Sequence, residues 1–160
     1  MKQVRSWDLA QVNIARLIEP LDSDRLSDFV SAIDDVNAAA DAAPGFLWRL
    51  KSEAGNTMSI RAFEWDISGS AGVVVNLSTW ESPQALRDYV YSPIHRAVLR
   101  RRREWTHQVA EHTTVLWWVP CHHRPSTHEA EERLRRIRRD GSSAMAFALH
   151  EDFDPPSRAN

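Results

Sequence analysis

The chain has little of what would tie it to an oxidising compartment or a membrane. It holds a single cysteine, Cys121, which cannot form an internal disulfide, so a reducing compartment is expected. No apolar run approaches the ~20 residues that a membrane span needs. The N-terminal residues also lack the apolar stretch of a signal peptide. We therefore expect a cytoplasmic protein with no membrane partner.

An excess of one charge is also missing. The formal net charge is −2, so no overall field favours nucleic acid. Residues 100–103 are four consecutive arginines, but on a helix such a run points around the whole circumference. A solvated, salt-bridged surface is therefore the favoured interpretation, and no nucleic-acid partner is expected.

Tyrosine is scarce, whereas tryptophan is abundant. The chain has two tyrosines and seven tryptophans. Tryptophan has the largest side chain and usually needs a partner for its N–H when it is buried. Seven of them imply a wide core, a ligand pocket, an oligomer interface or a mixture of these. The length predicts a single domain, placed at residues 1–150 with residues 151–160 as a frayed tail.

Hydrophobic periodicity predicts alternating strands and helices. Strands are expected at residues 7–16, 46–50, 73–80 and 113–119, with a short further strand at 58–63. Helices are expected from 22 or 23 to 42 and after Pro83. The second helix should kink or break near Tyr91 and Ser92, because Pro93 removes an N–H and clashes with the preceding turn. This order is that of an α+β, ferredoxin-like split βαβ fold with an antiparallel sheet.

A further segment follows this core of about residues 8–120. Ser126 and Glu129 have the spacing of a capping box, which predicts a helix over about residues 126–140. A last short strand is expected at residues 144–149. Both faces of the sheet should be largely apolar, since Trp117 and Trp118 are adjacent and must point to opposite faces. Two helices cover only one face, so either the C-terminal segment or a second subunit must cover the other, and a homodimer is the more economical answer.

Several stretches of the chain resemble one protein family. They are residues 11–16 (QVNIAR), 44–50 (PGFLWRL), 76–82 (NLSTWES), 95–105 and 116–120 (LWWVP). Over roughly residues 8–148 the chain resembles the DUF3291 family of bacterial proteins of unknown function. That family is similar to the antibiotic-biosynthesis-monooxygenase superfamily. The resemblance implies a dimeric α+β barrel, in a superfamily that includes cofactor-independent oxygenases and haem-degrading oxygenases.

The same resemblance bears on haem. In the haem-degrading group an active-site tryptophan falls where this chain has Tyr89, and the axial histidine falls where it has Leu99. Asn13 matches an active-site asparagine of that group. Because the ligand is missing at its expected place, no cofactor is the preferred expectation. Haem remains possible through His95, one turn earlier on the helix.

One helix stripe carries the candidate catalytic residues. Tyr91, His95, Leu99 and Arg102 fall near one line of a 3.6-residue helix, with Trp105 beside them. His95 would act as a general base, since imidazole titrates near neutral pH. Arg102 would hold an enolate, phenolate or carboxylate through paired hydrogen bonds. The alternative places His95 at a surface or interface, and Arg102 in a salt bridge with Glu104 or another acid.

Strand amides and aromatic residues complete the candidate pocket. Asn76 is the third candidate catalytic residue, because a buried mid-strand amide needs either a ligand or a cross-strand partner. Substrate-binding side chains are expected from the strands, the second helix and the loop after the fourth strand: Asn13, Trp48, Arg49, Trp80, Tyr89, Tyr91, Trp105, Trp118 and His122. For each tryptophan, a place in the core or at a dimer interface is the alternative.

Cys121, His122, His123 and His128 are potential metal ligands, but adjacent loop residues rarely converge on one ion, so no metal is expected. The preferred function is a cofactor-independent small-molecule enzyme of monooxygenase-like type. It would oxygenate, isomerise or cyclise an aromatic or polyketide-like substrate. The alternatives are a haem-binding or haem-using protein and a non-catalytic dimeric binding module. The absence of a cavity on the order of 300 Å³ would favour the last of these.

Overall fold

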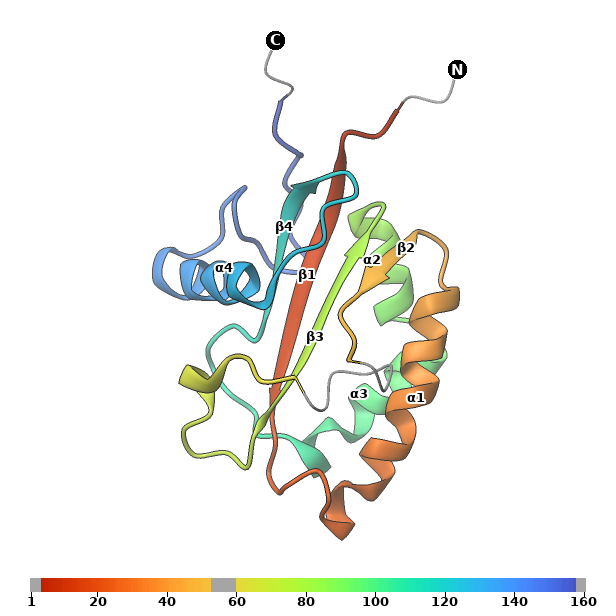
Figure 1. Cartoon of the computed structure of the whole chain (residues 1–160), viewed down its shortest axis with the longest axis vertical. Helices are drawn as coiled ribbons and strands as arrows, with labels where there is room; N and C mark the ends of the chain where they lie inside the picture. Colours follow the sequence, from red (N-terminus) through yellow and green to blue (C-terminus); the bar gives the residue numbers. More distant parts are fainter. Residues whose placement is uncertain (1–3, 53–59, 158–160) are drawn as a thin grey trace.

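The computed structural model describes residues 4–52 and 60–157, in which the strands form a four-stranded antiparallel sheet (Figure 1). The strands are β1 (Trp7–Arg16), β2 (Phe46–Arg49), β3 (Val73–Trp80) and β4 (Thr114–Pro120). Their order is β2-β3-β1-β4. This is the antiparallel ferredoxin-like arrangement, so the predicted α+β fold class is confirmed.

The short strand expected at residues 58–63 is not found. Residues up to 59 of that stretch lie outside the described part of the chain, and residues 60–63 are not in a strand. A 3-10 turn follows at Glu64–Asp66. Phe63, just before this turn, has a left-handed backbone, which does not fit an extended strand.

Three helices lie on one face of the sheet (Figure 1). They are α1 (Ser27–Ala42), which follows a 3-10 turn at Asp24–Leu26, α2 (Pro83–Val90) and α3 (Pro93–Trp105). The predicted break after Val90 is confirmed: Tyr91 and Ser92 separate α2 from α3, and Pro93 becomes the first residue of α3. At that position the missing proline N–H removes no helical hydrogen bond.

Helix α4 (Thr127–Asp140) covers the opposite face of the sheet (Figure 1). Ser126 Oγ accepts a hydrogen bond from the Glu129 N–H at 3.1 Å, which is one half of the predicted capping box. The Glu129 carboxylate turns instead to the sheet, where it accepts from Trp117 Nε1 at 3.0 Å. The apolar face of α4 packs on the sheet through Ala130, Leu134 and Ile137.

Residue alternation within each strand separates the two faces. The face toward α4 is built from Ala10, Val12, Ile14, Val75, Leu77, Val115, Trp117 and Val119. The face toward α1–α3 carries Leu9 and Trp80 near one end, and Asn13 paired directly with Asn76 toward the other. Of the two covers considered for the second face, the C-terminal segment occupies it, and a homodimer stays a prediction.

The strand expected at residues 144–149 is reduced to isolated bridges, Leu116 with Phe147 and Ser143 with Ala146. Phe147 and Leu116 exchange two backbone hydrogen bonds, at 2.8 and 2.9 Å. The chain beyond it is tied to the α1–α3 side, because Arg87 Nε donates to the Leu149 carbonyl at 2.9 Å and Trp118 Nε1 donates to the Phe153 carbonyl at 2.9 Å. Within the described residues, no helix is long and apolar enough to cross a membrane.

Candidate functional site

A cavity of about 280 Å³ lies between the sheet and the helices α1 and α3. Its volume is close to the lower end of the range for small-molecule pockets. Strands β1 and β3 form its floor, and the two helices form its walls. The polar residues of the floor are Asn13 and Asn76, and the helix walls include Phe29, Ala32, Ile33, Val36, His95, Val98, Leu99, Arg102 and Trp105.

Two aromatic rings make one end of the cavity rigid. Phe29 on α1 and Trp105 at the end of α3 meet with their ring centroids 5.3 Å apart and tilted by 46°. The Arg101 guanidinium lies 4.7 Å from the Trp105 ring centroid, on top of this pair. Trp105 is buried, so its ring presents a fixed apolar surface to the cavity.

Hydrogen bonds fix both amides on the cavity floor. Asn13 Nδ2 donates to Thr114 Oγ1 at 2.6 Å. Gln11 Nε2 donates to Asn76 Oδ1 at 3.3 Å and to Ser78 Oγ at 2.8 Å. Within the described residues, these contacts leave the Asn76 Nδ2 donors and the Asn13 Oδ1 acceptor without a protein partner. The floor therefore offers a ligand one donor group and one acceptor side by side.

A stack of rings links the floor to His95. Ser78 Oγ also accepts from Trp80 Nε1 at 2.9 Å, and Trp80 stacks on Tyr89 at 5.2 Å. Tyr89 in turn meets the edge of the His95 ring at 5.0 Å. Burial raises the pKa of Tyr89 to about 12, and its hydroxyl donates to the Val36 carbonyl at 3.2 Å. Tyr89 therefore stays neutral and supports the imidazole from behind.

His95 is held in its neutral form. Burial lowers the pKa of His95 below its ordinary value, and the Val90 carbonyl opposes only part of that shift. Its Nδ1 atom is buried and has no hydrogen-bond partner among the described residues. Most buried polar atoms have a hydrogen-bond partner, and this atom is one of five in the described residues that lack one. A neutral imidazole on a cavity wall is able to accept a proton.

Arg102 extends from the same helix face. Its Nε donates to Gln108 Oε1 and one terminal nitrogen donates to the Leu99 carbonyl, both at 3.3 Å. The expected alternative, an ion pair with Glu104, is instead made by Arg101, at 2.8 Å. Among the described residues, Arg102 forms no ion pair, so its charge is available at the cavity.

The structure brings only some of the predicted site residues together. Asn13, Asn76, His95, Arg102 and Trp105 all line the cavity. Trp80, Tyr89 and Trp118 lie instead in the adjoining core beneath α2. They do not line the cavity themselves. Tyr89, for example, contacts the cavity-lining residue His95.

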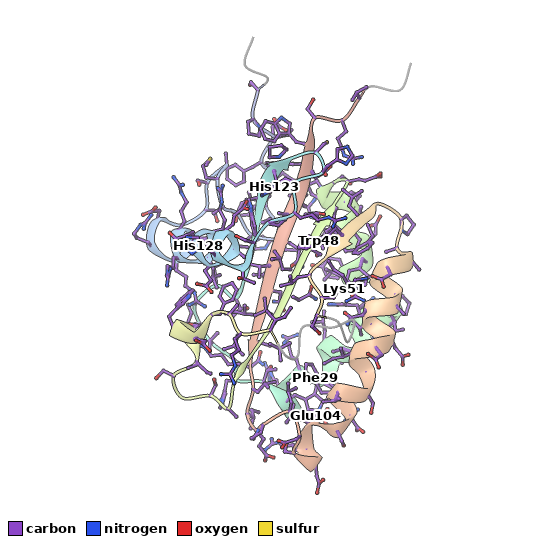
Figure 2. The ribbon with its side chains drawn as sticks, in the orientation of Figure 1. Phe29, Trp48, Lys51, Glu104, His123 and His128 are labelled. Atoms are coloured by element: carbon purple, nitrogen blue, oxygen red, sulfur yellow. The ribbon has the colours of Figure 1, made fainter. Side chains whose placement is uncertain are left out.

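The remaining predicted residues lie outside the cavity. Trp48 packs against the core on the α4 face, and Arg49 pairs with Asp41 at 2.7 Å. Tyr91 is 58% exposed. His122 follows β4 in a left-handed conformation, and its N–H donates to Asp8 Oδ2 at 2.9 Å. The part of the sheet that carries Trp48 is well separated from Phe29 in Figure 2.

The Cys-His group has other partners. Cys121 Sγ donates to Asp8 Oδ1 at 3.3 Å, and His123 Nε2 lies 2.7 Å from Glu129 Oε2. Figure 2 shows His123 and His128 on the β4–α4 side of the molecule, away from Phe29 at the cavity. In the described ranges, no three His, Cys, Asp or Glu side chains gather as a metal site would require.

Two sets of site residues were missed at the sequence level. Phe29, Ile33 and Val36 form the α1 wall, although the sequence predicted only a helix there. Gln11 lies in the predicted strand 7–16 and was given no role, yet it orients Asn76. The sequence signal for Gln11 is its parity with Asn13, because residues two apart on a strand share a face.

The fit to haem can be tested on the cavity wall. Leu99, where the resemblance places the axial ligand, lines the cavity with an aliphatic side chain that cannot bind iron. The Nδ1 atom of His95 is buried against protein atoms. The residues present therefore do not fit a haem ligated at position 99.

Comparison with known proteins gives the family. The chain matches DUF3291, a domain of unknown function, over residues 8–160. The chain belongs to the DUF3291 family, so the resemblance seen in the sequence is confirmed. None of the curated proteins matches it.

Two solved structures are similar at a distance. Rv0793 from Mycobacterium tuberculosis is 14% identical over 74% of this chain and 99% of that chain, with a TM-score of 0.45. SnoaB from Streptomyces nogalater, described as a cofactor-independent oxygenase, is 14% identical over 74% of this chain and 95% of that chain, with a TM-score of 0.40.

Proposed function

We propose that this cavity is the active site of a cofactor-independent small-molecule enzyme of monooxygenase-like type. In this proposal His95 removes a proton from a substrate with a largely apolar body. The observation that carries it is the position of His95: a half-buried, neutral imidazole stands on the wall of an apolar cavity, above two oriented amides.

The proposed step is a proton transfer from an acidic C–H or O–H of the substrate to the His95 imidazole. Negative charge then develops on a substrate oxygen. The free Asn76 Nδ2 donors face the cavity, and oriented donors of this kind stabilise such an oxyanion. The aliphatic and aromatic walls exclude water, which strengthens this interaction.

The resulting anion is electron-rich and has three possible fates. Dioxygen oxidises an activated CH₂ group to a carbonyl, and the second oxygen atom leaves as water. Reprotonation at another carbon is an isomerisation, and attack on an internal carbonyl is a cyclisation. All three begin with the same proton transfer, so a test of that transfer covers the whole proposal.

The experiment uses anthrone, whose CH₂ group is acidic and whose reaction with O₂ yields anthraquinone and water. Quinone absorbance and oxygen uptake are measured for the wild type, His95→Ala and the control His128→Ala, an exposed histidine on α4. Loss of a general base predicts a rate about 10²–10⁴-fold lower for His95→Ala and no change for His128→Ala. Under nitrogen, loss of deuterium from the labelled CH₂ group reports proton removal alone.

The proposal also predicts in which direction the rate changes with pH. Because burial lowers the pKa of His95 below its ordinary value, the imidazole is already neutral at pH 7. The rate should therefore be flat above pH 7 and fall on acidification through that lowered pKa. Unchanged turnover in His95→Ala, or a wild-type rate equal to that of buffer, would refute the proposal.

A further inference from the structure

Among its described residues, the cavity lining has basic side chains and no acidic ones. Its arginines and histidines are Arg16, His95, Arg102 and His107, and among the described lining residues there is no aspartate or glutamate. The chain as a whole has 22 acidic and 20 basic residues. The lining thus departs from the overall composition, and a concave site whose permanently charged side chains are arginines attracts anions.

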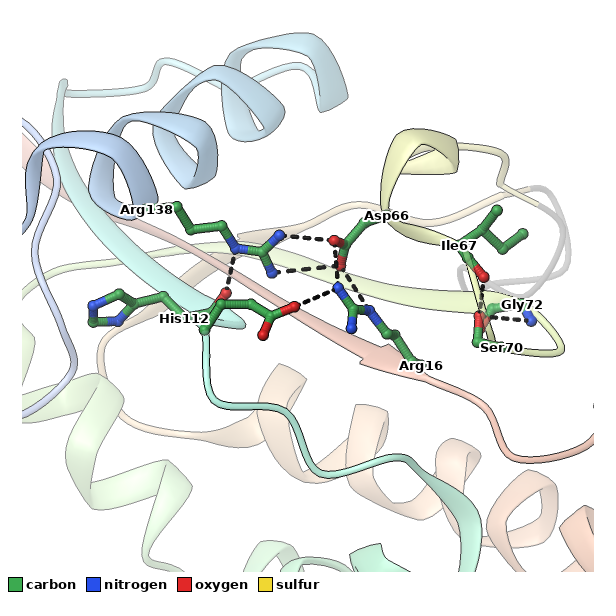
Figure 3. Close-up of polar contacts among 8 residues, drawn as sticks. Arg16, Asp66, Ile67, Ser70, Gly72, His112 and Arg138 are labelled. Atoms are coloured by element: carbon green, nitrogen blue, oxygen red, sulfur yellow. Dashed lines mark hydrogen bonds and ion pairs between the residues drawn. The ribbon is translucent and has the colours of Figure 1, made fainter.

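The two arginines of the lining differ in their partners. Arg16 is neutralised, since one of its terminal nitrogens lies 2.6 Å from Asp66 Oδ1 and 2.7 Å from Glu111 Oε1 (Figure 3). Arg102 has only the two neutral acceptors at 3.3 Å. A guanidinium carries five N–H donors in a planar fork, so Arg102 retains donors that match a carboxylate.

The spacing between Arg102 and His95 indicates the length of the ligand. Both line the cavity from α3, about two helical turns apart, or ~10 Å along the helix axis. The group bound by Arg102 is therefore distinct from the group that His95 deprotonates. Arg102 is exposed, which places it at the open end of the cavity, while the Asn13–Asn76 pair forms the floor.

We infer that the ligand is a small organic acid with an apolar, flat body. Its carboxylate pairs with Arg102 at the open end, and its carbonyl or hydroxyl oxygen accepts from Asn76 Nδ2 at the floor. The body between them contacts Phe29, Ile33, Leu99 and Trp105. The role of the inner oxygen rests on the proposed function, whereas the carboxylate contact does not depend on it.

Matched pairs of probes test the carboxylate. The acids are benzoate, 6-hydroxy-2-naphthoate and 2-anthracenecarboxylate, each compared with its neutral carboxamide by titration calorimetry at pH 7.5. The wild type should bind at least one acid about 10-fold or more tightly than its amide, the worth of a hydrogen bond between charged groups. Arg102→Gln should lose that preference while its affinity for the amide stays the same.

The control is Arg100→Gln, an exposed arginine on the same helix that does not line the cavity. It should keep the full preference for the acid. Equal affinity of the wild type for acid and amide, retention of the preference in Arg102→Gln, or no binding of any probe at millimolar concentration would overturn the inference.

Failure here can be separated from failure of the proposed function. Anthrone has no carboxylate, so its turnover does not depend on the Arg102 contact. His95→Ala should lose anthrone turnover and still prefer the acid over the amide. If His95→Ala keeps turnover, the proposed base is wrong and the acid specificity stands. If Arg102→Gln keeps the preference, the carboxylate contact is wrong and the proposed base stands.

Discussion

The two faces of the sheet are made by the same strands and have different contents. Toward α4, the strands contribute Val12, Val75, Leu77, Val115 and Trp117, each at most 1% exposed. Toward α1–α3, their neighbours include Gln11, Asn13, Asn76 and Ser78, and a cavity remains. The α4 face stabilises the fold, and the other face has the polar groups and space that a ligand needs.

An ion cluster closes the edge of the α4 face (Figure 3). Asp66 is 6% exposed and lies between Arg16 and Arg138, with contacts of 2.6 and 2.7 Å. Arg138 Nε also donates to the His112 carbonyl at 2.8 Å. Because Arg16 lines the cavity as well, this cluster joins the two regions.

Trp117→Ala should have the largest effect. This fully buried ring lies between the sheet and α4, so its truncation should cost about 3–5 kcal/mol of the free energy of unfolding. Urea unfolding measures the loss. Trp65→Ala, at a 38% exposed ring, is the control and should cost clearly less. Similar losses in the two variants would contradict the assignment of the main core to the α4 face.

Asp66→Asn should have the next largest effect. The free energy of unfolding should fall by on the order of 3 kcal/mol at pH 7, because two arginines lose their buried partner. Burial alone would raise the pKa of Asp66, but hydrogen bonds from Arg16 and Arg138 outweigh it and hold the pKa below its usual 3.8. The stabilisation by this carboxylate is present above that range and is lost as pH falls through the lowered pKa. The stability gap between wild type and variant should therefore close in strong acid.

The matched control is Asp140→Asn, whose carboxylate pairs with Arg139 at an exposed position. Its effect on the free energy of unfolding should be much smaller than that of Asp66→Asn, because an exposed ion pair is screened by solvent. A gap for Asp66→Asn that does not shrink on acidification would mean that the cluster does not stabilise through charge.

Ser78→Ala tests the link between core and cavity floor. The hydroxyl accepts from both Gln11 Nε2 and Trp80 Nε1, so its removal leaves the buried Trp80 donor unpaired and leaves Gln11 with only its longer contacts to Asn76. A loss of about 2 kcal/mol in the free energy of unfolding is expected. Ser31→Ala, an exposed serine on α1, is the control. No difference between the two variants would mean that Ser78 does not support the floor.

Asn76→Leu should have the smallest effect on stability, within about 1 kcal/mol, because its amide faces the cavity and keeps little protein contact. Turnover of anthrone should fall by about 10²-fold, since an oxyanion donor is lost. Unfolding and kinetics are measured on the same preparation. A large loss of stability with unchanged turnover would make Asn76 a core residue instead of a site residue.

The sequence determines much of this fold through local rules. Pro93 predicts the break between α2 and α3, since a proline ring cannot sit inside a helix. Strand alternation places Asn13 and Asn76 on one face and Val12 and Val75 on the other. For the cover of the second face the sequence favoured a homodimer over the C-terminal segment, because the apolar stripe of α4 would suit a partner subunit equally well. Only the three-dimensional path of the C-terminal segment decides between them.

Site residues could be predicted where they lie close together in the sequence, on one helix. The spacing of His95, Arg102 and Trp105 on one helix placed them together, and all three line the cavity. Trp48 and Trp118 were not separable from pocket residues, because a large aromatic ring suits a core and a pocket alike. Separating them needs the register, in which Trp48 pairs with Thr79 and so falls on the α4 face.

The central claim is that ligands bind on the α1–α3 face and not on the α4 face. Side-chain N–H signals of the ¹⁵N-labelled wild type, followed by NMR during titration with 6-hydroxy-2-naphthoate, test it directly, since each face carries its own reporters. The Asn76 amide and the Trp105 indole signals should shift while the Trp117 indole signal stays in place. A shift at Trp117 with none at Asn76 and Trp105 would contradict it.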